Sequence, residues 1–298
     1  MYSLNRDKVK FKVLNKSNKI NEIYFTSPYK SGYPEVDQAR ALLYQGNRLR
    51  EAIVFIHGTG RHFSSFSYYP KILSNNGYTT LMLILPYHYE RISKKDPISL
   101  AFLKGSSEVL EKKYEQSVID IFTCVDYLQQ QGFKKIHIMG FSLGGMIATI
   151  ASALDKRIHK VILTITGGNF EYTTWHSTAT KIFRIDYEED KSCNPKKCHQ
   201  IHQEFDKAAK EWKNLEELKK YPSCFRYDPS FFAAKLNSKD IVMFTALFDE
   251  CVPRKSSDDL WERIGKPRRY FLLSGHLTAH LFYKNFILRK TLKFLEEG

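Results

Sequence analysis

The chain has 298 residues, of which 43% are hydrophobic and 26% charged. These values are ordinary for a globular protein and exclude a disordered chain. Lys and Arg (46) exceed Asp and Glu (32), giving a net charge of +14, so nucleic acid or an anionic surface is a partner to consider. The basic residues are scattered in singles and pairs, with no run of five and no nucleic-acid-binding motif. We therefore expect a basic surface and no nucleic-acid partner.

Cysteine content and apolar runs bear on the compartment. The five cysteines are too few and too irregularly spaced for a disulfide framework, and their odd number favours a reducing environment. No signal peptide is evident, and the longest strongly apolar run, Leu81–Leu85, is far shorter than the ~20 residues of a transmembrane helix. We expect a cytoplasmic protein without a membrane span, and the sequence leaves the oligomeric state open.

The first 50 residues carry two short β-like runs, Val9–Leu14 and Ile23–Phe25, followed by a turn-rich segment. They predict an antiparallel lead-in at the edge of a sheet.

Residues 51–168 and 228–298 alternate short apolar runs with helical patterns. Strands are predicted at 52–56, 79–85, 136–139, 161–165, 241–246 and 270–273, and helices at 114–128, 143–154 and 277–295. Short apolar runs that end near Gly, Pro or Asp are typical of strands buried on both faces of a parallel sheet. The alternation predicts an α/β fold with a doubly wound, mostly parallel sheet.

Residues 169–227 interrupt this rhythm with aromatic side chains in a densely charged segment. We expect an inserted helical cap, with one charged helix at 199–220 anchored to the core by Trp212.

The segment Gly140-Phe141-Ser142-Leu143-Gly144 has the pattern G-x-S-x-G between a predicted strand and a predicted helix. In that context a tight turn lifts the serine hydroxyl out of the sheet, while glycines avoid collisions with neighbouring backbone. Ser142 is therefore the candidate nucleophile, the alternative being a glycine-rich turn with an incidental serine.

A serine nucleophile needs a base, and the base needs an orienting acid. His276 directly follows the last predicted strand, at the sheet edge where Ser142 is expected; His280 is its competitor. Asp249 follows the preceding strand, with Glu250 in reserve. Asp228 precedes a predicted helix and is expected to cap it.

His57-Gly58-Thr59-Gly60 closes the first core strand. The glycines let the backbone approach a substrate carbonyl, so the N–H groups of Thr59 and Leu143 are candidates for an oxyanion hole. We expect His57 itself to be a structural hydrogen-bonding residue.

Taken together, the four motifs that accompany predicted strands resemble the α/β-hydrolase superfamily, over residues 51–168 and 228–298. They are HGTG, GFSLGG, ALFDECVP and SGH, in chain order. The order Ser142, Asp249, His276 is the order of nucleophile, acid and histidine in that superfamily. The segment around Asp249 also resembles the dienelactone hydrolase and prolyl-oligopeptidase-like branch.

Four side chains are candidates for the substrate pocket. Tyr87 and His88 follow a core strand at the expected active-site edge, with an ordinary polar loop as the alternative. Phe170 and Trp175 start the cap on the same side, where they line a cleft above Ser142 or pack the cap onto the sheet.

Cys193, Cys198, His199 and His202 include zinc-type ligands, but their order fits no standard zinc motif. We therefore expect no metal, and we expect Cys251 to be a packed small residue.

The sequence thus predicts a serine hydrolase that cleaves an ester or related acyl bond through an acyl-enzyme and needs no cofactor. An acyltransferase with the same triad and a non-catalytic ligand-binding protein on the same fold are the alternatives.

Overall fold

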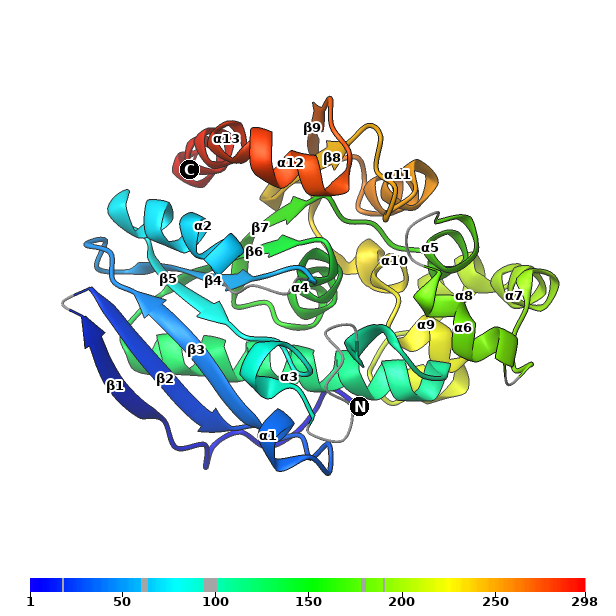
Figure 1. The fold of residues 1–298 in the computed structure, drawn as a ribbon, viewed down its shortest axis with the longest axis horizontal. Helices are drawn as coiled ribbons and strands as arrows, with labels where there is room; N and C mark the ends of the chain where they lie inside the picture. Colours follow the sequence, from blue (N-terminus) through cyan, green and yellow to red (C-terminus); the bar gives the residue numbers. More distant parts are fainter. Residues whose placement is uncertain (18, 60–63, 94–100, 178–180, 190, 298) are drawn as a thin grey trace.

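The computed structural model describes residues 1–17, 19–59, 64–93, 101–177, 181–189 and 191–297. Strands in these residues form one sheet in the order β1-β2-β3-β5-β4-β6-β7-β8-β9 (Figure 1). Their bounds are β1 Lys12–Ser17, β2 Ile20–Thr26, β3 Gln38–Tyr44, β4 Glu51–Ile56, β5 Thr79–Leu83, β6 Lys135–Phe141, β7 Ile158–Thr164, β8 Ile241–Ala246 and β9 Arg268–Leu272. The strands from β5 to β9 in this order run parallel, whereas β1, β2 and β3 pair antiparallel. The predicted mostly parallel α/β fold is confirmed.

Helices cover both faces of the sheet. On one face lie α2 (Ser64–Asn75), α12 (His276–Phe282) and α13 (Lys284–Glu296), and on the other lie α3 (Ser107–Gln130) and α4 (Leu143–Leu154) (Figure 1). Successive residues of a strand point to opposite faces. In β4, Ala52 and Val54 accordingly belong to the apolar cluster with α3 and α4, while Ile53 and Phe55 belong to the cluster with α2 and α13.

The N-terminal lead-in has one more strand than the sequence predicted. β3 pairs with β2 on one side and with β5 on the other, so it joins the antiparallel strands to the parallel part. Its sequence QARALLY is rich in Ala and Leu, which favour helices in isolation. Pairing on both sides overrides that preference, and no local pattern signalled it.

The cap segment (residues 169–227) contains several short helices. These are α5 Phe170–His176, α6 Ile182–Glu189, α7 Pro195–His202, α8 Phe205–Glu211, η3 Glu217–Lys220 and α9 Ser223–Arg226. Between the cap and β8 follow α10 Pro229–Phe232, η4 Ala233–Lys235 and η5 Ser238–Asp240. The remaining elements are α1 Pro34–Asp37, η1 Tyr89–Arg91, η2 Ala101–Leu103 and α11 Arg254–Arg263.

Two predicted long helices are wrong because the chain turns within each of them. The predicted helix 199–220 is broken first between α7 and α8, after His202. It is broken again at Trp212, which has extended backbone dihedrals and buries its ring against Phe231 and Phe232. The predicted helix 277–295 is divided at Tyr283 into α12 and α13.

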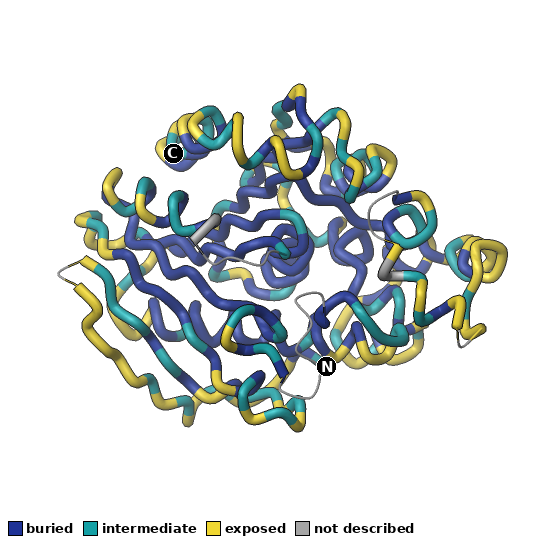
Figure 2. The backbone as a smooth tube through the Cα atoms, in the orientation of Figure 1, coloured by how far each residue is buried: buried dark blue, intermediate teal, exposed yellow. Residues whose placement is uncertain are grey.

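The cap segment shares its apolar core with the sheet. Phe205, Trp212 and Phe225 belong to the same buried cluster as residues of α3 and α4, and Figure 2 shows buried backbone continuing from the sheet into the cap. The segment is therefore fixed to the rest of the fold, while its boundaries at 169 and 227 stay a prediction. Among the described residues, none of the helices combines the length and the apolarity that a membrane span requires.

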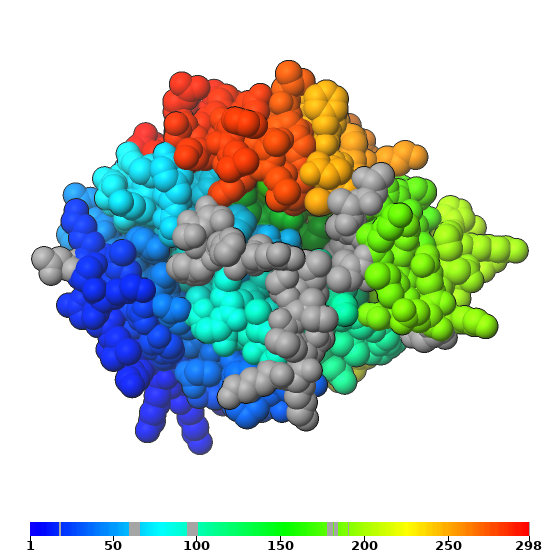
Figure 3. All heavy atoms as spheres, viewed as in Figure 1, coloured from blue at the N-terminus to red at the C-terminus, as the bar shows by residue number. Residues whose placement is uncertain are grey.

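The outer side of α12 lies at the surface. In Figure 3 its red-orange atoms lie beside the gold atoms of the segment that follows β8. The backbone N–H of Phe248 in that segment donates to the carbonyl of Ser274, just before α12, at 3.0 Å. The loops after β8 and β9 therefore meet at one edge of the sheet.

Candidate active site

Ser142 stands in the sharp turn between β6 and α4. Its backbone dihedrals, φ 50° and ψ −117°, lie in a region that side chains rarely adopt. The turn is tight because a Cβ on Gly140 would lie 2.4 Å from the Gly144 carbonyl oxygen, and one on Gly144 would lie 2.4 Å from the carbonyl oxygens of Ile56 and His57. The glycines of the motif thus allow the close packing that presents the serine.

His276 connects Ser142 to Asp249. Its Nε2 lies 2.8 Å from the Ser142 hydroxyl oxygen, and its Nδ1 lies 2.9 and 2.8 Å from the two carboxylate oxygens of Asp249. Both the imidazole and the carboxylate are largely buried. Since a carboxylate can only accept, Nδ1 carries the proton, and Nε2 is left to accept from the serine hydroxyl. The structure thus brings the three predicted residues into one hydrogen-bonded chain.

The backbone around the acid and the base holds both in place. Asp249 Oδ1 accepts from the N–H groups of Cys251 and Val252 at 2.9 and 2.7 Å. The Glu250 carboxylate, the reserve acid of the sequence prediction, accepts from the backbone N–H of His276 at 2.9 Å. Glu250 therefore positions the start of α12, and Asp249 is the carboxylate that meets the imidazole.

The end of β4 lies against the serine. A Cβ on Gly58 would be 3.2 Å from Ser142 Cβ. His57 is fully buried; its Nδ1 lies 2.7 Å from the Gly58 carbonyl oxygen, and its Nε2 accepts from the Leu85 N–H at 3.1 Å. Burial, with the nearby His88, lowers the His57 pKa to about 3, so its neutral ring donates from Nδ1 to the carbonyl. His57 has the structural hydrogen-bonding role expected of it; Gly60 lies outside the described residues.

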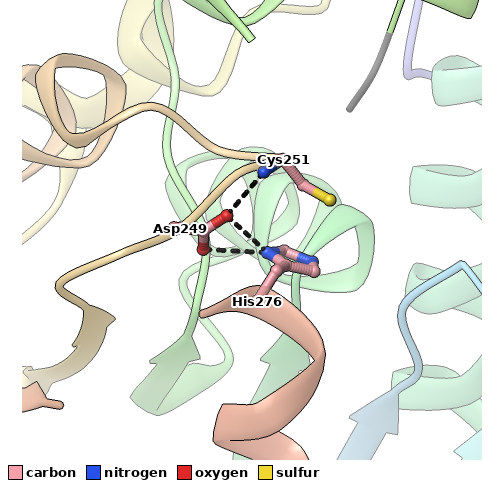
Figure 4. A group of neighbouring side chains, drawn as sticks. All are labelled: Asp249, Cys251 and His276. Atoms are coloured by element: carbon pink, nitrogen blue, oxygen red, sulfur yellow. Dashed lines mark hydrogen bonds and ion pairs between the residues drawn. The ribbon is translucent and has the colours of Figure 1, made fainter. Parts of the chain in front are cut away.

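Cys251 lies closer to the triad than the sequence indicated. Asp249, Cys251 and His276 each offer a ligand atom, and these atoms lie within 4.8 Å of one another (Figure 4). However, the carboxylate and the imidazole already share a proton. Burial, followed by the charges of Asp249 and Glu250, also raises the Cys251 pKa to about 12, which keeps the thiol protonated. This chemistry fits a proton-transfer chain better than a metal centre.

The two predicted pocket residues after β5 have different surroundings. His88 is buried, with its ring packed against His57, Tyr89 and Phe102 and its Nδ1 2.9 Å from the Pro86 carbonyl oxygen. His88 thus lies deeper than a surface loop residue, and its pocket role stays a prediction. Tyr87 is half-buried, with φ 61° and its ring near Phe102.

Phe170 and Trp175 line a cavity of about 300 Å³ within the cap. Its other walls come from the start of α3, from α6 and α7, and from the segment 222–227. None of the triad residues is in this lining. The end of α5 nevertheless reaches the acid loop, because the Ser177 hydroxyl donates to the Glu250 carbonyl at 3.1 Å.

The remaining candidates have structural surroundings. His199 turns to the Glu171 carboxylate, and His202 Nδ1 lies 2.9 Å from the Cys198 carbonyl oxygen. Within the described part of the chain, the Cys193, Cys198, His199 and His202 set does not form a metal-ligand cluster. His280 packs against Phe66 and Tyr69. The Asp228 side chain caps α10 as expected, accepting from the Ser230 N–H.

Comparisons with known proteins bear on the fold and the family. "Putative esterase/lipase 2" of Mycoplasma pneumoniae is 26% identical over 121 residues, 40% of this chain and 39% of that protein. "Uncharacterized protein YdjC" of Bacillus subtilis is 34% identical over 70 residues, 24% of this chain and 60% of that protein. The chain thus covers less than two thirds of these curated relatives.

A solved acetyl xylan esterase from Paenibacillus sp. R4 has a similar fold, with a TM-score of 0.58 at 13% identity, over 94% of this chain and 88% of that one. The sequence profile of the α/β-hydrolase fold family matches residues 51–203, about half of the chain. The match contains β4, the HGTG segment and the turn that bears Ser142. The chain therefore belongs to the α/β-hydrolase fold family.

Proposed function

We propose that this protein is a serine hydrolase that cleaves carboxylic esters through an acyl-enzyme. Ser142 Oγ attacks the ester carbonyl carbon while His276 Nε2 takes the hydroxyl proton. His276 then gives that proton to the departing alcohol oxygen, and the acyl group stays on Ser142. A water molecule, deprotonated by the same nitrogen, attacks the acyl carbon and releases the carboxylic acid and the free serine. Asp249 holds the imidazole in the required tautomer and stabilises its charged form.

The observation that carries this proposal is the continuous hydrogen-bonded chain from Asp249 through His276 to Ser142. It occurs in the strained turn before α4, where a hydroxyl is exposed to attack a substrate. A serine that only filled a turn would have no need of a buried imidazole and carboxylate behind it.

For the oxyanion hole we propose the backbone N–H groups of Thr59 and Leu143. Leu143 begins α4, and the first N–H groups of a helix have no partner within the helix. The hydrogen bond from the His57 ring keeps the Gly58 carbonyl pointing toward that ring. In a planar trans peptide the next N–H points the opposite way, so that of Thr59 is directed away from His57. Since Gly58 packs on Ser142, we expect this donor on the serine side of β4.

The nucleophile is tested with a fluorophosphonate probe on the purified protein. We expect the wild type to be labelled and Ser142→Ala to be unlabelled, with equal thermal stability for both. Ser177→Ala is the control, since Ser177 is a buried hydroxyl outside the triad. Labelling of Ser142→Ala at the wild-type rate would overturn the assignment.

The reaction is tested with p-nitrophenyl esters of increasing chain length, with and without alcohol acceptors. We expect hydrolysis without an acceptor, and loss of it in Ser142→Ala. Turnover that required an acceptor would indicate an acyltransferase, and binding without turnover a ligand-binding protein. We also propose that the cavity lined by Phe170 and Trp175 receives part of the acyl chain, so that Trp175→Ala changes the chain-length preference.

A further inference from the structure

Large apolar side chains are exposed around the candidate base. The apolar rim consists of Phe248 (66% exposed), Phe271 (49%), Leu273 (68%), Leu277 (70%), Leu281 (61%) and Phe282 (77%). It makes up half of the exposed large apolar side chains of the described residues. Exposed apolar groups that gather in one place mark an interaction surface, whereas scattered single ones do not.

The rim is continuous in space. Leu277 and Leu281 are four residues apart on α12, so they lie on one side of the helix, and Phe282 follows. The loop with Phe248 is hydrogen-bonded to Ser274, beside Leu273. Figure 3 shows α12 and the segment after β8 side by side on the same face of the molecule.

Basic side chains outnumber acidic ones around the rim. Residues 268–295 contain six Lys or Arg and no Asp or Glu. At the start of α11, Arg254 and Lys255 are exposed, and the Arg254 guanidinium lies 4.7 Å from the centre of the Phe271 ring. Acidic side chains are also present, since Asp258 pairs with Arg254 and Arg269 and Glu250 is exposed in the loop of Phe248. The rim is thus an apolar surface with a predominantly basic border, on a chain with a net charge of +14.

We propose that the apolar rim docks the protein onto anionic lipid membranes, so that the enzyme takes acyl esters of membrane lipids as substrates. Apolar side chains of such a surface enter the boundary between headgroups and acyl chains, and the cations around them bind anionic headgroups. A second copy of this chain is the poorer occupant, because a symmetric contact would place two predominantly basic borders against each other.

The position of the base links docking to catalysis. His276 is the first residue of α12, and Leu277 of the rim follows it directly. A membrane that covers the rim therefore lies next to the hydrogen-bonded chain of Ser142, His276 and Asp249. An ester held at the headgroup level has a short path to Ser142. This assignment of the substrate class rests on the proposed serine hydrolase function, whereas membrane docking does not.

Docking is tested by co-sedimentation with vesicles of phosphatidylcholine, alone or with phosphatidylglycerol at roughly a third of the lipid. The full chain carries Ser142→Ala, so that no lipid is consumed. We expect binding to anionic vesicles to be at least about tenfold tighter than to neutral ones, and weaker at high salt. Adding Leu281→Gln/Phe282→Gln should lower binding about tenfold or more. The control Val13→Gln/Leu14→Gln, on the exposed edge strand β1, should bind like its parent.

Several outcomes would overturn docking: no binding to anionic vesicles, equal binding by the Leu281→Gln/Phe282→Gln protein, or a dimer in sedimentation equilibrium that this double substitution dissociates. With Ser142 restored, the double variant should hydrolyse p-nitrophenyl acetate like the wild type but release less fatty acid from vesicle lipid. A wild type that binds vesicles yet hydrolyses no ester would refute the proposed function and leave docking standing. A wild type that hydrolyses p-nitrophenyl acetate but binds no vesicle would refute docking alone.

Discussion

Replacing His57 with Phe tests whether the buried ring positions the proposed oxyanion hole. Phe keeps the aromatic packing against Phe66 and His88 but removes both ring nitrogens. The Gly58 carbonyl then loses its donor, and the Leu85 N–H loses its acceptor. Both are in fully buried surroundings, so water cannot replace the lost partners.

The size of the effect follows from those two lost hydrogen bonds. A buried polar group left unsatisfied costs about 1–3 kcal/mol, so the substitution should lower the free energy of unfolding by about 2–6 kcal/mol. For a chain of this length the Tm should fall by roughly 4–12 °C. If the Gly58–Thr59 peptide also rotates, one oxyanion donor is lost, which typically lowers kcat by about 10²–10³-fold. KM should change much less, since the developing charge exists only in the transition state.

The assay combines thermal melts with ester kinetics at a temperature where both proteins are folded. His137→Phe is the matched control, because His137 is also buried but neither ring nitrogen has a hydrogen-bond partner within the described structure. It should keep kcat and equal or exceed the wild-type Tm. A folded His57→Phe protein with kcat within about twofold of the wild type would refute the positioning role.

Three further predictions concern the acid, a buried carboxyl and the cap. Asp249→Asn should lower kcat about 10³–10⁴-fold at nearly unchanged Tm. The N–H groups of Cys251 and Val252 hold the amide oxygen, so the amide NH₂ group faces His276 and imposes the wrong tautomer on the imidazole. A loss of kcat much smaller than this would contradict the role of Asp249. Burial raises the Asp228 pKa to about 7, so the folded protein binds a proton that the unfolded chain releases, and its stabilising contribution falls as pH rises from about 4 to 7. In urea titrations the free energy of unfolding of Asp228→Asn should therefore rise relative to that of the wild type between about pH 4 and 7. A difference between the two proteins that stays constant over this interval would exclude the raised pKa of Asp228. Trp212→Ala should cost about 3–5 kcal/mol with kcat intact, since its ring is buried in the core; a melt within 1–2 °C of wild type would refute this.

The catalytic candidates could be located in the sequence because each one directly follows a strand. The parallel strands β6, β8 and β9 all end at the same edge of the sheet, so the residues after them are brought together by the fold itself. Short apolar runs located these strands, and the turn chemistry after each run singled out Ser142, Asp249 and His276. What the sequence could not resolve was that Glu250 binds the backbone of His276, since two adjacent carboxylates differ only in where the turn directs them.

The substrate side was less predictable because it depends on packing between segments with no periodic pattern of their own. The helical pattern of the cap is broken at Trp212, whose aromatic ring turns inward, and charge periodicity does not reveal this break. The depth of His88 is likewise set by its neighbours His57 and Phe102 rather than by its place after a strand.

The exposed leucines of the apolar rim could not be told from core residues by their spacing in the sequence. Leu277 and Leu281 are spaced like core residues of an amphipathic helix, and α12 does bury Ala279 and His276 on its inner side. The sequence therefore predicted helical structure here, although as one helix instead of two, and it could not show that two leucines of α12 point to solvent. A helix needs one apolar face to pack on the sheet, and a second apolar face has no role in the folded chain alone. Such a face lowers solubility, so its position beside His276, the candidate base, is best explained by the membrane surface that we propose covers it.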